Sequence, residues 1–104
     1  MVYKITITDF AFEQLNNITD YIFYNLMNPD AAERVLDDFE NAMDKLRRTA
    51  GLFALCEEPE LAQHGYRRYH FERHRYILLY RIVGQEIFID RVYHELQDYQ
   101  NLED

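Results

Sequence analysis

The spacing of the apolar residues changes once in the body of this 104-residue chain, and that change restricts its fold more than any other feature. From residue 9 to residue 50 apolar residues recur every three or four positions, which is typical of amphipathic helices. From residue 66 to residue 93 they alternate or form short runs rich in Tyr, Ile and Val, which is typical of strands. The pattern therefore predicts an α+β domain, with helices encoded before most of its sheet.

The helical part predicts a hairpin of two antiparallel helices. Thr8 or Asp9 can cap the first helix, because a side-chain oxygen at that position accepts a free backbone N–H. Asn28 and Pro29 end the first helix and open the second, with Asn28 as its cap, and Gly51 is the predicted stop. The apolar stripes of the two helices are Ala11, Leu15, Ile18 and Ile22, and then Ala32, Val35, Leu36, Phe39, Ala42, Met43 and Leu46.

Four segments have the pattern of strands. Residues 2–8 alternate between apolar and polar side chains, and three further segments follow a predicted loop at residues 50–65. These three are Tyr66–Phe71, Arg75–Val83 and Glu86–Tyr93. The gaps between them suit tight hairpins, so the predicted order is β-α-α-β-β-β, with the helical hairpin packed on a mainly antiparallel sheet. A short C-terminal helix is expected within residues 94–104, and the place of the first strand in the sheet is left open.

Length and composition favour one compact domain over residues 1–104. The chain has nine Tyr and seven Phe but only three Gly and two Pro, which disfavours disorder. No stretch approaches the roughly 20 apolar residues that span a bilayer, and the N-terminus lacks the features of a signal peptide. Cys56 is the only cysteine, so a disulfide within the chain is excluded. A cytoplasmic protein is the prediction.

The third predicted strand indicates which side of the sheet faces the helices. Its uncharged face is expected to pack on them and contains Tyr76, Leu78, Tyr80 and Ile82. The other face contains Arg75, Ile77, Leu79 and Arg81. We expect this second face to be open, and an open sheet face that displays arginine is a candidate binding surface.

Charge is distributed unevenly along the chain. The net charge of −8 disfavours non-specific binding to nucleic acid. Residues 66–94, however, carry six Arg against three acidic residues, whereas the segments before and after them are acidic. The strand region is therefore a local basic site, and Arg suits bidentate contacts with phosphate or carboxylate. Arginines that merely pair with acids of the helices are the competing interpretation.

Several segments together resemble the RelE/ParE toxin superfamily of type II toxin–antitoxin modules. They are MNPDAAERVLDDFENAMDKL at the helix junction, HGYRRYHFERHRYILLYRI through two strands, and IFIDRVYHELQDY at the end. The resemblance covers nearly the whole chain, and its specificity lies in the order and spacing of these short motifs.

The resemblance implies a small cytoplasmic toxin that a cognate antitoxin neutralises, as a homodimer or a toxin–antitoxin hetero-oligomer, with no cofactor, no metal and no membrane partner. It also implies one of two targets. ParE-type members inhibit DNA gyrase, and RelE-type members cleave mRNA in the ribosome without a metal. A third alternative is a non-toxic relative that keeps only antitoxin binding.

Metal-free RNA cleavage requires a base for the 2′-OH, a cation for the phosphorane and an acid for the leaving oxygen. The residues that the resemblance offers for these roles are Arg81, Arg91, His94 and Tyr99. Two departures favour the ParE-like branch. Ile77 stands where RelE-type ribonucleases have Arg, and Gln97 stands where members often have Arg. The acidic total charge also disfavours ribosome entry.

Other chemical motifs in the chain favour structural interpretations. His94, at the end of a strand, can bond locally instead of transferring protons. His70 and His74 have a spacing that binds metals on helices, but here it spans a predicted hairpin turn. The acids at residues 57, 58 and 60 are expected to be solvated, and Cys56 to be a small packing residue.

Overall fold

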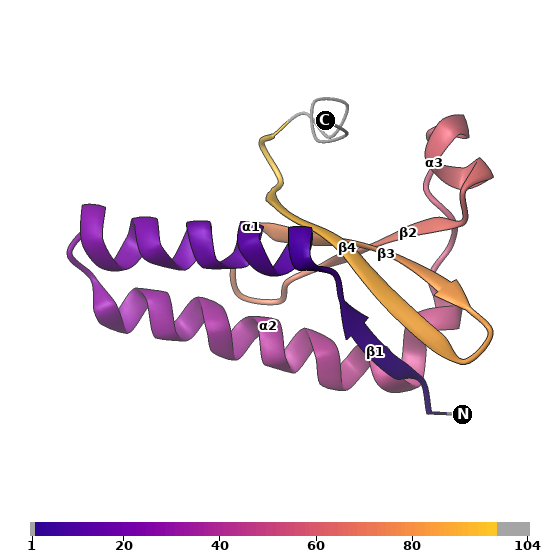
Figure 1. Cartoon of the computed structure of the whole chain (residues 1–104), viewed down its shortest axis with the longest axis horizontal. Helices are drawn as coiled ribbons and strands as arrows, with labels where there is room; N and C mark the ends of the chain where they lie inside the picture. Colours follow the sequence, from indigo (N-terminus) through magenta and orange to yellow (C-terminus); the bar gives the residue numbers. More distant parts are fainter. Residues whose placement is uncertain (1, 98–104) are drawn as a thin grey trace.

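A computed structural model describes residues 2–97 and places two long helices beside a four-stranded sheet (Figure 1). The elements are β1 (Lys4–Ile7), α1 (Asp9–Asp20), a π-helical turn (Tyr21–Asn25), α2 (Pro29–Thr49), a 3₁₀ turn (Ala50–Leu52), α3 (Pro59–Gln63), β2 (Tyr66–His70), β3 (Tyr76–Val83) and β4 (Glu86–His94). The predicted α+β class and the order of the long elements are confirmed.

Both helices begin where the sequence predicts. The Thr8 hydroxyl accepts the Ala11 N–H at 3.2 Å, and the Asn28 side chain accepts the Ala31 N–H at 3.1 Å. These bonds satisfy backbone donors that the first turn of a helix leaves free. The two helices lie side by side and run in opposite directions (Figure 1), as expected for a hairpin with so short a connection.

The tip of the helical hairpin departs from regular geometry. The last turn before the connection is π-helical, and Met27 has a left-handed backbone with φ of 53°. That conformation is costly for a side chain other than Gly or Asn. The apolar spacing did not predict the π-helical turn or the left-handed Met27, because it is equally compatible with a regular α-helix up to the connection.

The sheet has the strand order β1-β4-β3-β2, with β1 parallel to β4 and the remaining pairs antiparallel. The last strand of the chain therefore lies beside the first one, and Ile5 pairs with Ile87. Gly84, with φ of 63°, makes the tight turn between β3 and β4. The pairing of β3 with β4 shifts register between Leu79 and Tyr80 of β3. Asp90 of β4 is the extra residue of the resulting bulge.

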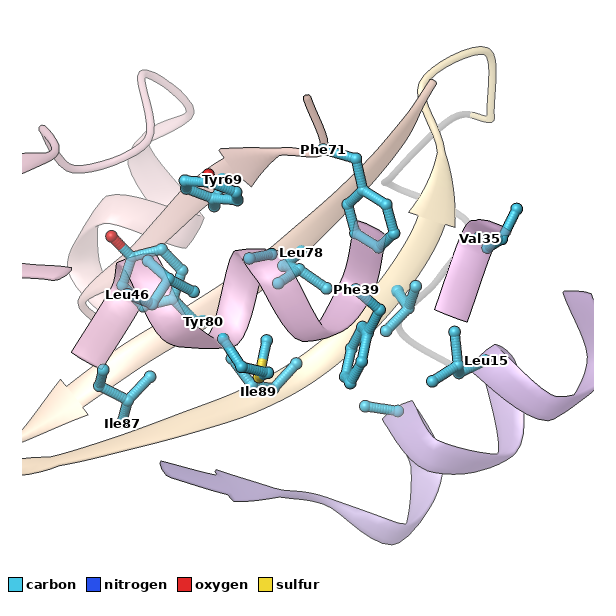
Figure 2. Close-up of a cluster of buried hydrophobic side chains, with 14 of the residues drawn as sticks. Leu15, Val35, Phe39, Leu46, Tyr69, Phe71, Leu78, Tyr80, Ile87 and Ile89 are labelled. Carbon is cyan, nitrogen blue, oxygen red and sulfur yellow. The ribbon is translucent and has the colours of Figure 1, made fainter. Parts of the chain in front are cut away.

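The main core lies between the helices and one face of the sheet (Figure 2). Phe39 and Leu46 of α2 pack against Leu78, Tyr80 and Ile89 of the strands, and all five side chains are buried. The predicted inward face of β3 is confirmed, since Tyr76 and Ile82 also pack against this cluster. Residues at alternate positions on a strand share one face, which is why the pattern predicted this part of the fold.

The segment predicted as a loop at residues 50–65 contains two helical turns. The 3₁₀ turn continues α2 past Thr49, so Gly51 lies inside it instead of stopping the helix. A Cβ at Gly51 would lie 2.8 Å from the Tyr3 hydroxyl, so a larger residue there requires the Tyr3 side chain to shift. The short helix α3 follows, and it starts at Pro59 in the position that proline favours.

The predicted C-terminal helix at residues 94–104 falls mostly outside the described residues, which end at residue 97. Among the described residues, no helix combines the length and hydropathy needed to cross a bilayer.

Candidate functional site

The outer face of the sheet, which points away from α1 and α2, is covered at its centre. Ile77 and Leu79 of β3 are only 5% and 6% exposed and form a second apolar cluster with Leu61 of α3. Cys56 and Tyr93 complete this cluster. The prediction of an open arginine face was therefore wrong at the middle of β3. Local pattern could not reveal this, because the cover comes from Cys56 and Leu61, which precede β2 in the chain.

Arg81 lies at the margin of this outer face and is held by an acidic partner. Its Nε donates to the Asp90 carboxylate at 2.8 Å, and its guanidinium lies 4.6 Å from the centre of the Phe88 ring. The hydrogen bond to Asp90 raises the pKa of Arg81 above its ordinary value. Asp90 is buried, and the bulge in β4 aims its side chain at this arginine. Arg81 is thus paired in a fixed orientation.

Tyr66 belongs to the same group of polar side chains. Burial and then the Asp90 carboxylate raise the pKa of the Tyr66 phenol. The carboxylate disfavours a second negative charge beside it.

Arg91 is also engaged. Its Nη1 donates to the backbone carbonyl of Asp90 at 2.8 Å, and its guanidinium stacks over the Phe10 ring at 4.3 Å from the ring centre. A guanidinium over an aromatic face gains about 0.5–2 kcal/mol, more where water is excluded. Arg91 therefore links β4 to the start of α1.

His94 ends β4 and bonds within its own surroundings. Its Nδ1 accepts the Leu96 N–H at 3.1 Å, and its backbone N–H donates to the Gln97 side chain at 2.8 Å. Its ring packs edge-on against Tyr76, with the ring centres 5.3 Å apart. This arrangement agrees with the structural interpretation of His94, and it leaves Nε2 as the ring nitrogen that does not make these bonds.

The predicted catalytic residues are spread along the ladder between β3 and β4. Arg81 pairs with Phe88 at one end, and His94 pairs with Tyr76 at the other. Tyr76 and Arg81 are five positions apart on β3, which is about 17 Å at the rise of a strand. The structure therefore does not bring Arg81 and His94 to one phosphate. Arg91 lies between them, Tyr99 lies outside the described residues, and the catalytic roles of all four stay predictions.

One polar network of the outer face was missed by the sequence analysis. Arg68 of β2 makes two hydrogen bonds to Glu58, at 2.8 and 2.7 Å, and its Nε donates to the Tyr93 hydroxyl at 2.9 Å. Glu58 is therefore an ion-pair partner and not a solvated loop acid. The bidentate geometry fixes α3 over the sheet. Cys56, which was predicted to be a small packing residue, is buried in the same surroundings, and burial raises the pKa of its thiol.

A second missed contact joins α2 to the turn between β2 and β3. Asp38 accepts the Arg73 N–H at 3.0 Å and contacts His74 Nδ1 at 2.8 Å, with its own side chain only 1% exposed. These two contacts of Asp38 hold the turn between β2 and β3 against α2. Among the described residues, no group of three His, Cys, Asp or Glu side chains is placed to hold a metal ion.

The hairpin tip displays a cluster of large apolar side chains. We call it the tip patch, and its members, all more than a third exposed, are Tyr21, Phe23, Tyr24, Leu26 and Met27. Residues 5–33, which include it, contain five acidic residues and no Lys, Arg or His. An exposed apolar patch of this kind is typical of a protein interaction surface.

A groove of about 1000 Å³ runs between the C-terminal half of α2 and β2. Lys45, Arg47 and Arg48 line it from the helix, and Arg68 and His70 line it from the strand. It is a basic recess in an otherwise acidic protein.

Comparisons with known proteins agree with the resemblance seen in the sequence. Residues 5–99 match the family described as ParE toxin of type II toxin-antitoxin system, parDE. Among solved structures, the chain is similar to the chromosomal ParDE TA system from P. aeruginosa, with 25% identity and a TM-score of 0.73 over 89% of this chain and 96% of that chain.

The fold is also similar to the toxin–antitoxin complex RelBE2 from Mycobacterium tuberculosis, with 23% identity and a TM-score of 0.60 over 90% of this chain and 99% of that chain. No match is found among curated proteins. Because the family match spans nearly the whole chain, the protein belongs to the ParE toxin family of type II toxin–antitoxin systems.

Proposed function

We propose that this protein is a cytoplasmic growth-inhibiting toxin that a cognate antitoxin neutralises, and that it acts by binding a protein target such as DNA gyrase. Family membership supports the toxin role, and the similar ParDE and RelBE2 structures are toxin–antitoxin systems, which supports an antitoxin partner.

The covered outer face is the observation that favours protein binding over RNA cleavage. Metal-free cleavage needs a cation, a base and an acid around one phosphate. Here Ile77 is buried beneath α3, and Arg81 is paired with Asp90 about 17 Å along the sheet from His94. The tip patch adds support, because exposed aromatic side chains are the typical anchors of protein interfaces.

Inducible expression in a bacterial host tests the proposal. We expect growth arrest when the chain is expressed alone, and relief when the protein encoded by an adjoining short reading frame is co-expressed. Plasmid supercoiling is expected to change before the rate of protein synthesis falls. Growth without arrest would contradict a toxin role, and an early stop in translation with cleaved mRNA would contradict the protein-binding mechanism.

Matched variants separate the two mechanisms. Under the proposal, Arg81→Ala and His94→Ala keep their toxicity, because neither residue carries out chemistry, whereas Tyr24→Asp in the tip patch loses it. Folding of each variant is checked by circular dichroism. Loss of toxicity in the two sheet variants, with Tyr24→Asp fully toxic, would favour a nuclease instead.

A further inference from the structure

The tip patch has the composition of the centre of a protein interface. It lies at the connection between α1 and α2, at the opposite end of the molecule from the turn between β3 and β4 (Figure 1). Phe23 and Tyr24 pack against each other there, with their ring centres 4.7 Å apart. Aromatic and methionine side chains are enriched at protein interfaces, and Met27 is 81% exposed.

Backbone hydrogen bonds fix the connection that carries the patch. The Leu26 N–H donates to the Tyr21 carbonyl at 3.1 Å, and the Asn28 N–H donates to the Ile22 carbonyl at 3.1 Å. Ile22 is buried and belongs to the main core, so it anchors this turn. A surface that is already ordered loses less conformational entropy when it binds a partner.

Acidic side chains flank the tip patch on both sides. Asp20 precedes it, Asp30 and Glu33 follow it near the start of α2, and all three are exposed. None of the ion pairs described for residues 2–97 includes these three acids. Their uncompensated negative charge attracts a basic partner and repels an acidic one.

The same charge disfavours a second copy of this chain as the occupant of the patch. A symmetric contact places the same surface of both copies together. Through the tip patch, such a contact would bring the acids of one copy close to those of the other, and like charges at an interface are costly.

We infer that the tip patch binds a basic, apolar segment of a partner protein. Apolar residues of the segment pack on Tyr24 and Leu26, and its Lys or Arg side chains lie near Asp20 and Glu33. The groove between α2 and β2, with its basic lining, is unsuited to such a segment. The identification of this partner with the target of the toxin rests on the proposed function.

A designed peptide tests the chemistry of the surface without knowledge of the target. The probe is a short fluorescein-labelled peptide of leucine and lysine only, with its leucines at helical spacing, titrated against the full chain by fluorescence anisotropy. We expect saturable binding, and binding weaker by about tenfold or more for the same peptide with glutamate in place of lysine. Binding is also expected to weaken in high salt, because salt screens exposed charges. Equal binding of the two peptides would overturn the inference.

One pair of variants tests the apolar contact. Leu26→Ser is expected to weaken binding of the lysine peptide by about fivefold or more, because it removes an apolar anchor from the patch. Leu52→Ser makes the same change at an 82% exposed position of the 3₁₀ turn and is expected to bind normally. Equal effects of the two substitutions would overturn the inference.

A second pair of variants tests the charge. Asp20→Asn combined with Glu33→Gln removes two charges beside the patch and is expected to weaken binding by about fivefold at low salt. Glu57→Gln combined with Glu60→Gln removes two charges at exposed positions before and within α3. This control has the same net charge and is expected to bind like the parent protein, so an equal loss in it would contradict a local role for the acids.

The biological form of the inference is tested in cells. Leu26→Ser is expected to lose toxicity while the purified variant still binds the tagged antitoxin. A variant that stays toxic and is no longer relieved by the antitoxin would assign the tip patch to the antitoxin and would overturn the inference. So would a dimeric free protein that this substitution makes monomeric, because a second copy would then occupy the patch.

Absence of growth arrest with the parent chain would count against the proposed function alone. The peptide titration and the two pairs of variants still decide what the tip patch binds, because none of these measurements depends on toxicity.

Discussion

Asp38 shows how one side chain on α2 fixes a distant turn of the chain. It is buried, it accepts the Arg73 N–H, and it contacts His74 Nδ1. A carboxylate in such a position is stabilising only while both partners are present, because a buried unpaired polar group is costly.

Replacement of Asp38 by Ala is expected to destabilise the fold by about 1–3 kcal/mol, because the Arg73 N–H and the His74 ring lose their acceptor. Urea denaturation at pH 7 measures the change. Asp37→Ala is the matched control, because Asp37 has the same charge but is exposed. An equal loss in the control would show that charge, and not the buried contacts, is responsible.

At the same scale, Arg68 illustrates a limit of sequence reasoning. The residue stands in a conspicuous pair of arginines, but its partner Glu58 lies ten positions earlier and looks like one of several loop acids. The pairing depends on how the loop folds back over the sheet. By contrast, the cap at Asn28 was predictable, because a capping bond joins residues only three positions apart.

At the scale of elements, the connection between α1 and α2 combines a π-helical turn with a left-handed Met27. Strain of this kind concentrates at functional sites, and Met27 is also the most exposed member of the tip patch, at 81%. The conformation therefore supports a role for the tip patch in binding.

Met27→Gly is expected to stabilise the protein by up to about 1 kcal/mol, because glycine adopts positive φ without a steric penalty. Thermal denaturation measures the change. Met27→Ala removes the same side chain but keeps the penalty, so it is expected to give no such gain. A gain of equal size in the alanine variant would indicate that exposure of the methionine, and not its backbone, limits stability.

The short helix α3 protects the second apolar cluster. Leu61 is 6% exposed and packs beside the buried Cys56. Leu61→Ala is expected to raise the rate at which Cys56 reacts with a thiol reagent by about tenfold or more, which corresponds to a loss of roughly 1.4 kcal/mol or more in local stability.

The rate is followed by absorbance with a disulfide reagent at pH 8. Leu52→Ala, at an 82% exposed position of the preceding 3₁₀ turn, is the control and is expected to react like the parent protein. If the Leu61 variant also reacts at the parent rate, then α3 does not limit access to the thiol.

At the scale of the whole molecule, the buried tyrosines make the free energy of unfolding decrease at alkaline pH. Burial raises the pKa of several phenols, namely Tyr69, Tyr76, Tyr80 and Tyr93. Above pH 10, the ordinary pKa of the phenol, the unfolded chain releases these protons while the folded chain retains them. Stability from these groups is therefore present below pH 10 and is lost as the pH rises further.

A fully buried tyrosine such as Tyr80 is expected to contribute a loss that approaches about 1.4 kcal/mol per pH unit above pH 10. Urea denaturation between pH 8 and pH 11 measures the slope, and absorbance at 295 nm reports phenol ionisation. Tyr80→Phe is expected to reduce the slope, because Tyr80 is fully buried. Tyr24→Phe, at a 67% exposed position, is expected to leave it unchanged. Identical slopes in all three proteins would contradict the assignment to Tyr80.

Acidic and basic side chains also lie in different parts of the molecule. Residues 5–33 carry only acidic charge near the tip patch, whereas the groove beside β2 has a basic lining. The total charge of −8 hides this separation. Segment counts revealed the basic strands, but only the fold showed that α2 contributes Lys45, Arg47 and Arg48 to the same recess.

The sequence by itself determined the two long helices, the strands, the caps and the inward face of β3, because each depends on residues within a few positions of one another. The family also follows from the order and spacing of local motifs. The tertiary structure alone decided that β1 pairs with β4, that Cys56 and Leu61 pack over Ile77 and Leu79, and that Arg81 and His94 lie apart. These features join residues far apart in the chain, and the free energy of such contacts depends on packing that no local pattern encodes.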